Sequence, residues 1–175
     1  DILVNNAGIT GPDVPTEEVE EADWDRMFAI NVKSVLFMTK HAIKYLRESG
    51  KGAIVNTSSL SGIVGDTELT PYHATKGTIV IMTQKDAIQY APDHIRVNCV
   101  CPGTVMTPMT HRAMKARGKY TKAAKAMQAS TAKHSTLAVG TCSDLDIAKI
   151  LLFLCSDDSA PINGQTIVAD YGANL

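Results

Sequence analysis

The chain has 175 residues, with 17 Lys+Arg against 18 Asp+Glu, a formal net charge of −1 and 45% hydrophobic residues. The near-neutral charge argues against a nucleic-acid-binding protein, which normally carries a basic excess. No apolar run approaches the roughly 18–20 residues that a membrane span requires, so we expect no membrane partner. The length suits one domain that can bury a sizeable core.

Short apolar runs alternate along the chain with longer helical patterns, which is typical of βαβ units and a parallel sheet. Strands are predicted at 2–4, 53–56, 95–101 and 166–169. Apolar residues recur at helical spacing over 24–46, which predicts one long helix. A second long helix is predicted over 72–90, and a third begins at a capping box on Ser143 and runs to residue 155. No repeat or linker divides the chain, so residues 1–175 are treated as a single domain.

The four cysteines stand at positions 99, 101, 142 and 155, and no pair has the CxxC spacing of a zinc site. We therefore expect no bound metal. Cys99 and Cys101 lie in an apolar run and are predicted to be small buried side chains. The spacing gives little support for disulfides, which favours a reducing, cytoplasmic setting.

Tyr72 and Lys76 form the sharpest local pattern of the sequence. Their i, i+4 spacing at the start of a predicted helix places both on one helix face, with the ammonium near the phenol. A phenol titrates near ~10, which is too high for efficient proton transfer at neutral pH, and a nearby cation lowers that pKa. By itself the pair is weak evidence, because such pairs also occur on helix surfaces by chance.

Polar and small residues also follow the predicted strands. They are Asn6-Ala7-Gly8, the serines at 58, 59 and 61, and Pro102-Gly103. The carboxyl ends of parallel strands share one edge of a sheet, so these residues and Tyr72 are expected to meet at one rim. The alternative is a set of ordinary strand-to-helix turns, which use the same residue types.

Several motifs occur in a fixed order over essentially the whole chain. They are Asn5-Asn6-Ala7-Gly8, Ile30-Asn31-Val32, a serine thirteen positions before Tyr72, Tyr72-xxx-Lys76, Ile95–Asn98 with Pro102–Thr107, and Asn163–Val168. This order and spacing resemble those of the short-chain dehydrogenases/reductases. The resemblance implies an α/β fold with a Rossmann-like doubly wound parallel sheet, of which this chain lacks the first three β–α units.

The resemblance implies a role in the reaction for Asn31, Ser59, Tyr72 and Lys76. Tyr72 would move a proton to or from the substrate oxygen, and Ser59 would hydrogen-bond that oxygen. Lys76 would lower the pKa of Tyr72 and hold the ribose of the nicotinamide. Asn31, expected in the middle of the first long helix, would anchor a water that links Lys76 to bulk solvent.

The implied cofactor is NAD or NADP, with NAD slightly favoured. The residues implied to contact it are Asn6, Ala7, Gly8, Tyr72, Lys76, Pro102, Gly103, Val105 and Thr107. The first three would lie against the adenosine half, where small residues allow close approach. The last four would border the nicotinamide. Asn5 is expected instead to tie neighbouring strands together.

The implied activity is the NAD(P)-dependent interconversion of a small secondary alcohol and a ketone. The family is commonly homo-oligomeric, so a dimer or tetramer with the two long helices at its interface is expected. A serine hydrolase is disfavoured because the G-x-S-x-G motif is absent, and a zinc alcohol dehydrogenase because clustered Cys and His ligands are absent.

Two other hypotheses stay open because the family's Gly-rich turn, which receives the pyrophosphate, is not in this chain. The chain is then an inactive fragment, or a non-enzymatic scaffold of the same fold. A further choice concerns residues 94–143, which contain basic but no acidic residues. They form either a lid that steers an anionic substrate or the solvated face of a helix, and we favour the solvated face.

Overall fold

The computed structural model describes residues 1–12, 14–65, 69–116 and 141–173. The main elements are β1 (Ile2–Asn5), α1 (Glu21–Asn31), α2 (Lys33–Glu48), β2 (Gly52–Thr57), α3 (Thr70–Tyr90), β3 (Ile95–Pro102), α4 (Pro108–Ala116), α6 (Asp144–Cys155) and β4 (Thr166–Ala169). Short 3₁₀ helices occupy Thr16–Glu18, Leu60–Gly62, Ala91–Asp93 and Asp157–Ser159. The four predicted strands are thus confirmed. Residues 117–140, which belong to the basic stretch expected to form either a lid or a solvated helix face, lie outside the described residues.

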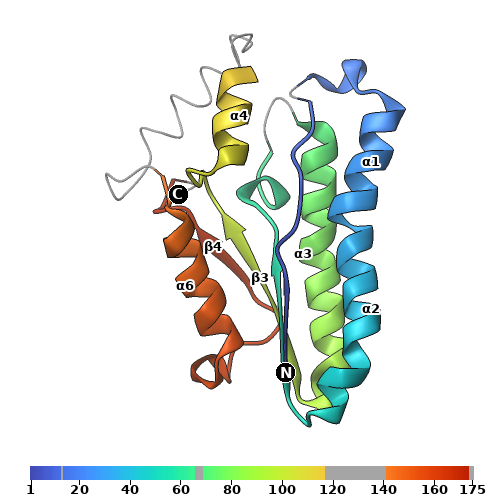
Figure 1. Ribbon diagram of the computed structural model, residues 1–175, viewed down its shortest axis with the longest axis vertical. Helices are drawn as coiled ribbons and strands as arrows, with labels where there is room; N and C mark the ends of the chain where they lie inside the picture. The colour runs from blue at the N-terminus through green and yellow to red at the C-terminus, as the bar shows by residue number, and fades with distance from the viewer. Residues whose placement is uncertain (13, 66–68, 117–140, 174–175) are drawn as a thin grey trace.

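The four strands form one parallel sheet in the order β1-β2-β3-β4. Helices α2 and α3 pack on one face of the sheet and α6 on the other (Figure 1). The predicted α/β fold with a doubly wound, Rossmann-like parallel sheet is therefore confirmed. Because the strands are parallel, their carboxyl ends share one edge of the sheet. Within the described residues, no helix is both long and apolar enough for a bilayer crossing.

Alternate residues of the central strands supply two separate cores, as the two-residue period of a strand requires. Ile54 in β2 packs toward α2 and α3, whereas its neighbour Val55 packs toward α6. Cys99 and Cys101 in β3 are fully buried in a cluster with Ile79 of α3. The prediction that these two cysteines are small buried side chains is confirmed.

A chain of buried polar side chains joins β1, β2 and α3. The Asn5 side chain donates to Asn56 Oδ1 at 2.8 Å, and Asn56 donates to Thr83 Oγ1 at 2.9 Å. Asn56 and Thr83 are fully buried, so an unpaired amide here would carry a full desolvation penalty. Asn5 ties neighbouring strands together, as expected from the sequence.

The single long helix predicted over 24–46 is wrong, because the structure divides it at Val32 into α1 and α2. The Ser34 hydroxyl donates to the carbonyl of Ile30, one turn earlier and across the division. Back-bonding of this kind bends helices. Asn31 therefore stands at the end of α1 instead of in the interior of one helix.

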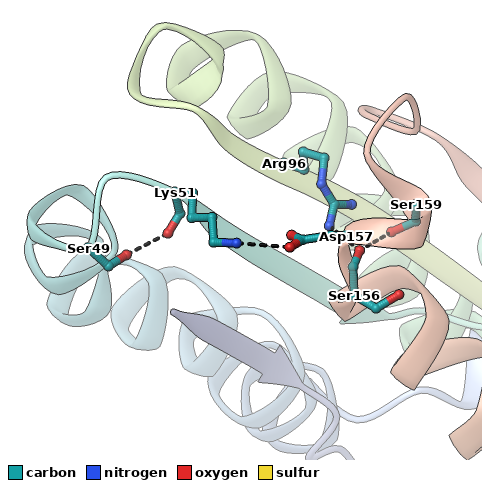
Figure 2. A network of polar contacts seen from close by, with 6 residues as sticks. All are labelled: Ser49, Lys51, Arg96, Ser156, Asp157 and Ser159. Atoms are coloured by element: carbon teal, nitrogen blue, oxygen red, sulfur yellow. Dashed lines mark hydrogen bonds and ion pairs between the residues drawn. The ribbon is translucent and has the colours of Figure 1, made fainter.

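The amino edge of the sheet is held by polar contacts that converge on the end of α6 (Figure 2). The Arg96 guanidinium donates to the carbonyls of Leu154 at 3.1 Å and Ser156 at 3.0 Å. A cation is favourable at a helix C-terminus, where backbone carbonyls lack helical partners. At the other end of α6, the predicted capping box is confirmed, with reciprocal bonds between Ser143 and Asp146.

Candidate active site

A pocket of about 590 Å³ opens at the carboxyl edge of the sheet, beside the first turns of α3. Its lining includes Asn6, Gly8, Thr57, Ser58, Ser59, Tyr72, Lys76, Pro102, Gly103, Val105 and Thr107. The structure thus brings together most of the residues that the sequence places at one rim. Three of the expected residues are not in this lining: Ala7, Asn31 and Ser61. Ala7 is exposed, and Asn31 is almost completely buried.

Tyr72 enters the pocket from the first turn of α3. Leu69 caps this helix in a left-handed conformation (φ 64°), and Pro71 lies in the first turn, where its missing N–H is not needed. Ser59 approaches from the loop after β2, where its Oγ accepts from the backbone N–H of Ser61 at 3.2 Å. The side chains of Ser59 and Tyr72 are hydrogen-bonded to each other. Two segments distant in the sequence therefore meet at one hydroxyl pair.

Lys76 lies one helical turn after Tyr72. Its Nζ is 5.6 Å from the centroid of the Tyr72 ring, within cation–π range, and donates to the Thr57 carbonyl at 2.9 Å. Burial lowers the pKa of Lys76 to about 8. The ammonium is therefore still mostly protonated at pH 7.

The pKa of Tyr72 is raised above its ordinary value of 10.0, because burial disfavours the phenolate. The hydrogen bond with Ser59 acts in the opposite direction and is the smaller effect. This net direction differs from the lowering by Lys76 that the sequence led us to expect. In the chain by itself, burial outweighs the nearby cation, so the phenol keeps its proton at neutral pH.

Asn31 lies directly behind the pocket. Its side chain accepts from the N–H of Ile9 at 2.8 Å and donates to the carbonyl of Ile9 at 2.9 Å. It also donates to Thr75 Oγ1 at 3.2 Å, on the turn of α3 between Tyr72 and Lys76. Asn31 thus fixes the segment after β1 against α3, and its expected role in a water relay stays a prediction.

Gly8 keeps the space beside Lys76 open. A Cβ at this position would lie 3.2 Å from Asn31 Oδ1 and 3.7 Å from Lys76 Nζ. On the other side of the pocket, a Cβ on Gly103 would lie 2.7 Å from the Cβ of Asp170. Both glycines therefore allow backbone and side chains to approach more closely than an alanine would.

Val105 and Thr107 stand where the chain leaves β3 and enters α4. Val105 pairs with Cys142 in an isolated parallel bridge, and its carbonyl accepts from the hydroxyl of Thr110. Thr107 Oγ1 accepts from the N–H of Thr110 at 3.3 Å. These contacts hold both residues at the pocket, and their expected contact with the nicotinamide stays a prediction.

A sequence model described as enoyl-(acyl carrier protein) reductase matches residues 1–174. The chain belongs to the short-chain dehydrogenase/reductase family. Cyclopentanol dehydrogenase of Comamonas sp., for example, is 37% identical over 172 residues, which make up 98% of this chain and 65% of that protein. The chain thus spans about 65% of the length of this curated relative.

Solved structures of similar proteins agree with this assignment. A 3-ketoacyl-(acyl-carrier-protein) reductase from Brucella melitensis, complexed with NADH, is 31% identical with a TM-score of 0.85, covering 100% of this chain and 67% of that one. The structure of ElxO with NADP bound is 29% identical with a TM-score of 0.84, covering 99% of this chain and 66% of that one. Short-chain dehydrogenases/reductases similar to this chain therefore include both NADH- and NADP-bound structures.

The polar groups beside Lys76 fit the ribose of a nicotinamide nucleotide. An ammonium carries three N–H donors, and the bond to Thr57 uses one of them. Thr57 Oγ1 is buried and has no hydrogen-bond partner among the described residues. A pair of vicinal hydroxyls can both accept from the ammonium and bond the threonine oxygen. The described residues therefore fit the nicotinamide half of the dinucleotide that a short-chain dehydrogenase/reductase binds.

Sequence reasoning missed the part of the pocket that comes from α6, where Asp144, Ile147, Ala148 and Leu151 line it. Met109, Thr110 and Arg112 of α4 also line the pocket, and they belong to the basic stretch expected to form either a lid or a solvated helix face. The spacing of Ile147 and Leu151 indicates an apolar helix face, but it does not say which part of the sheet that face covers. Thr57 was also missed, although its place at the carboxyl end of β2 is a usable signal.

Proposed function

We propose that the protein is an NAD(P)-dependent oxidoreductase that interconverts a small secondary alcohol and a ketone. The main support is that Ser59, Tyr72 and Lys76 line the same pocket, with Ser59 hydrogen-bonded to Tyr72 and the ammonium of Lys76 beside its ring. The name of the Comamonas relative supports a secondary alcohol as the substrate class.

In the reducing direction, Ser59 donates a hydrogen bond to the ketone oxygen and holds it beside Tyr72. Tyr72 gives its proton to that oxygen as negative charge develops there. Tyr72 holds its proton at neutral pH, as the reducing direction requires, but its raised pKa makes the phenol a weaker acid, and stabilisation of the phenolate has to offset this. In the oxidising direction, the phenolate takes the proton back.

Lys76 stabilises the phenolate that is left, because its ammonium lies against the same ring. NAD or NADP, when bound, supplies the hydride or accepts it. Lys76 and Thr57 would hold its ribose, and the segment from Pro102 to Thr107 would border its nicotinamide. Asn31 acts one layer back, by keeping the segment after β1 and the first turns of α3 in place.

We propose a homo-oligomer, a dimer or tetramer, for the complete gene product. The support is a set of exposed apolar side chains on the two long helices α2 and α3: Leu36, Phe37, Ile81 and Ile88. Light scattering coupled to gel filtration tests the proposal. A monomer at micromolar concentration would contradict it.

The deciding experiment for the reaction is Tyr72→Phe in the complete gene product, assayed with cyclopentanol and either NAD or NADP. Loss of the acid–base group should reduce kcat by about 10²–10⁴-fold, while the affinity for the reduced cofactor changes by no more than about threefold. Tyr45→Phe, which alters an exposed tyrosine of α2, is the matched control. Unchanged turnover in Tyr72→Phe would refute the proposed role.

Titration of this chain with NADH and with NADPH separates the proposal from the inactive alternatives. Binding of NADH or NADPH at micromolar concentration excludes an inactive fragment that cannot hold the dinucleotide. Binding of neither supports that fragment or a scaffold instead. The comparison of the two titrations also decides between NAD and NADP, of which we expect NAD.

A further inference from the structure

A second pocket, of about 370 Å³, adjoins the first. The two share Gly8, Ile9, Met109 and Arg112 in their linings, so they form one continuous depression. The second pocket lies between α1 and α4, both of which stand at the carboxyl end of the sheet (Figure 1). A molecule whose reacting carbon lies beside Tyr72 can therefore extend into it.

Two arginines from distant parts of the sequence line this second pocket. Arg26 comes from α1 and Arg112 from α4, together with one carboxylate, Asp23. Two guanidinium groups against one carboxylate leave a net charge of +1. In the part of the chain that the structure describes, the ion pairs involve other residues, so neither arginine is neutralised there by a carboxylate. The guanidinium groups are thus available to a ligand.

The lining between the arginines and the hydroxyl pair is largely apolar. Ile9 and Met109 belong to both pockets, and Met27, which is almost completely buried, forms the wall of the second. Gly11 contributes by its lack of a side chain, because a Cβ there would lie 2.2 Å from Met27 Cε. The depression therefore offers hydroxyl groups at one end, an apolar middle and guanidinium groups at the other end.

We infer that the substrate is a hydroxy acid or its oxo form, with the reacting oxygen at one end of an apolar skeleton and an oxyanion group at the other. Guanidinium groups pair with carboxylate and phosphate oxygens in bidentate geometry, which gives both affinity and orientation. Arg112 lines both pockets, so it is placed to hold the oxyanion while the carbon skeleton reaches Tyr72. The inference rests on the proposed function and adds the substrate class.

The test uses alcohols that differ only in charge: cis-4-hydroxycyclohexanecarboxylate, the corresponding carboxamide, and 4-hydroxycyclohexyl phosphate. The complete gene product is compared with Arg26→Gln, Arg112→Gln and the double variant. Arg47→Gln, which removes an arginine of α2 that lines neither pocket, is the matched control. The readouts are kcat/KM for each alcohol and, independently of turnover, calorimetric binding of the carboxylate.

The wild-type protein should prefer one of the charged alcohols to the carboxamide by roughly 10- to 100-fold, the value of one hydrogen bond to a charged group. Arg26→Gln should lose most of that preference while its kcat/KM for the carboxamide changes by no more than about twofold. Arg112→Gln alters the lining of both pockets, so its kcat/KM should fall for every alcohol, but by at least about fivefold more for the charged alcohol than for the carboxamide. Asp23→Asn should increase kcat/KM for the charged alcohol, because it removes a repelling charge from the same pocket. The better of the two charged alcohols distinguishes a carboxylate from a phosphate.

Equal kcat/KM for charged and neutral alcohols, or an equal loss on both in the arginine variants, would overturn the inference. If no alcohol is turned over, the proposed function fails, and the calorimetric arm still decides on the anion site. Binding of the carboxylate that disappears in the double variant but persists in Arg47→Gln supports the site. Absence of binding to the wild-type protein overturns it.

Discussion

The side-chain amide of Asn31 is bonded to both backbone groups of Ile9, donating to its carbonyl at 2.9 Å and accepting from its N–H at 2.8 Å. Asn31 is almost completely buried at the end of α1, whereas Ile9 belongs to the segment that lines the pocket after β1. The N–H and the carbonyl of Ile9 therefore both find their hydrogen-bond partner in the Asn31 side chain. Asn31 acts as a positioning residue for the pocket wall.

Asn31→Ala is expected to destabilise the protein by about 2–4 kcal/mol, because it leaves the N–H and carbonyl of Ile9 without partners. Urea denaturation of the complete gene product measures this loss. The control is Asn6→Ala, which truncates an exposed asparagine three residues before Ile9. It should change the free energy of unfolding by less than about 0.5 kcal/mol. A loss below that value in Asn31→Ala would mean that water takes over both bonds.

Local periodicity made the first part of the site predictable. The i, i+4 spacing of Tyr72 and Lys76 fixes their common face as soon as the segment is a helix, and the carboxyl-edge rule for parallel strands places Ser59 and Pro102 near them. These inferences need only the period of each element and the direction of the strands. They do not depend on how the helices pack.

Features that depend on packing could not be predicted in the same way. The long helix is divided at Val32, where the Ser34 hydroxyl donates to the Ile30 carbonyl across the division. Helical periodicity in the sequence does not reveal such a bond. The raised pKa of Tyr72 depends on how deeply the ring is buried. Arg26 and Arg112 are far apart in the sequence, and only the packing of α1 and α4 brings them to one pocket.

Gly62 and Gly65 provide a matched test of the loop that carries Ser59. A Cβ on Gly62 would lie 2.6 Å from Ser58 Oγ and 2.8 Å from the carbonyl oxygen of Lys76, which are themselves hydrogen-bonded at 2.7 Å. Gly62→Ala should therefore cost about 1–3 kcal/mol of stability and reduce turnover, because it pushes the loop away from α3. Gly65 has nothing within 4 Å of its Cβ position, so Gly65→Ala should be nearly neutral. Urea denaturation and steady-state assays of both variants provide the comparison, and equal effects would contradict it.

Lys76 gives the stability of the protein a defined pH dependence. Its pKa is about 8 in the folded chain against an ordinary 10.5, so below pH 8 the folded state bears the full cost of a buried ammonium. As the pH rises above 8, the folded state loses this proton before the unfolded state does, and the free energy of unfolding increases. Between about pH 7 and 9.5 the Lys76 contribution should increase it by about 2 kcal/mol.

Lys76→Met removes this contribution. The stability advantage of Lys76→Met over the wild type should therefore shrink as the pH rises from about 7 to 9.5, which urea denaturation at a series of pH values measures. The raised pKa of Tyr72 acts with the opposite sign, but only above its ordinary value of 10.0, outside this range. A difference between the two proteins that does not vary with pH would refute the assignment to Lys76.

Arg96 and Lys51 make polar contacts at the amino edge of the sheet, near the end of α6 (Figure 2), and should differ greatly in their contribution to stability. Arg96 is half-buried and donates to two carbonyls at the end of α6, whereas the ion pair of Lys51 with Asp157 is largely exposed. Arg96→Met should cost about 1–3 kcal/mol, because it removes two charge-assisted hydrogen bonds and leaves the carbonyls of Leu154 and Ser156 with only their bonds from Ser159.

Lys51→Gln should cost less than about 0.5 kcal/mol, since exposed ion pairs are screened and weak. Arg96→Lys should recover only part of the loss, because a single ammonium lacks the planar fork that reaches both carbonyls. Urea denaturation of the three variants gives these values, and hydrogen exchange of the amides in α6 should accelerate in Arg96→Met alone. If Arg96→Met and Lys51→Gln were equally stable, Ser159 and solvent would be enough to satisfy the carbonyls at the end of α6, and the guanidinium would not be what holds α6 to the sheet.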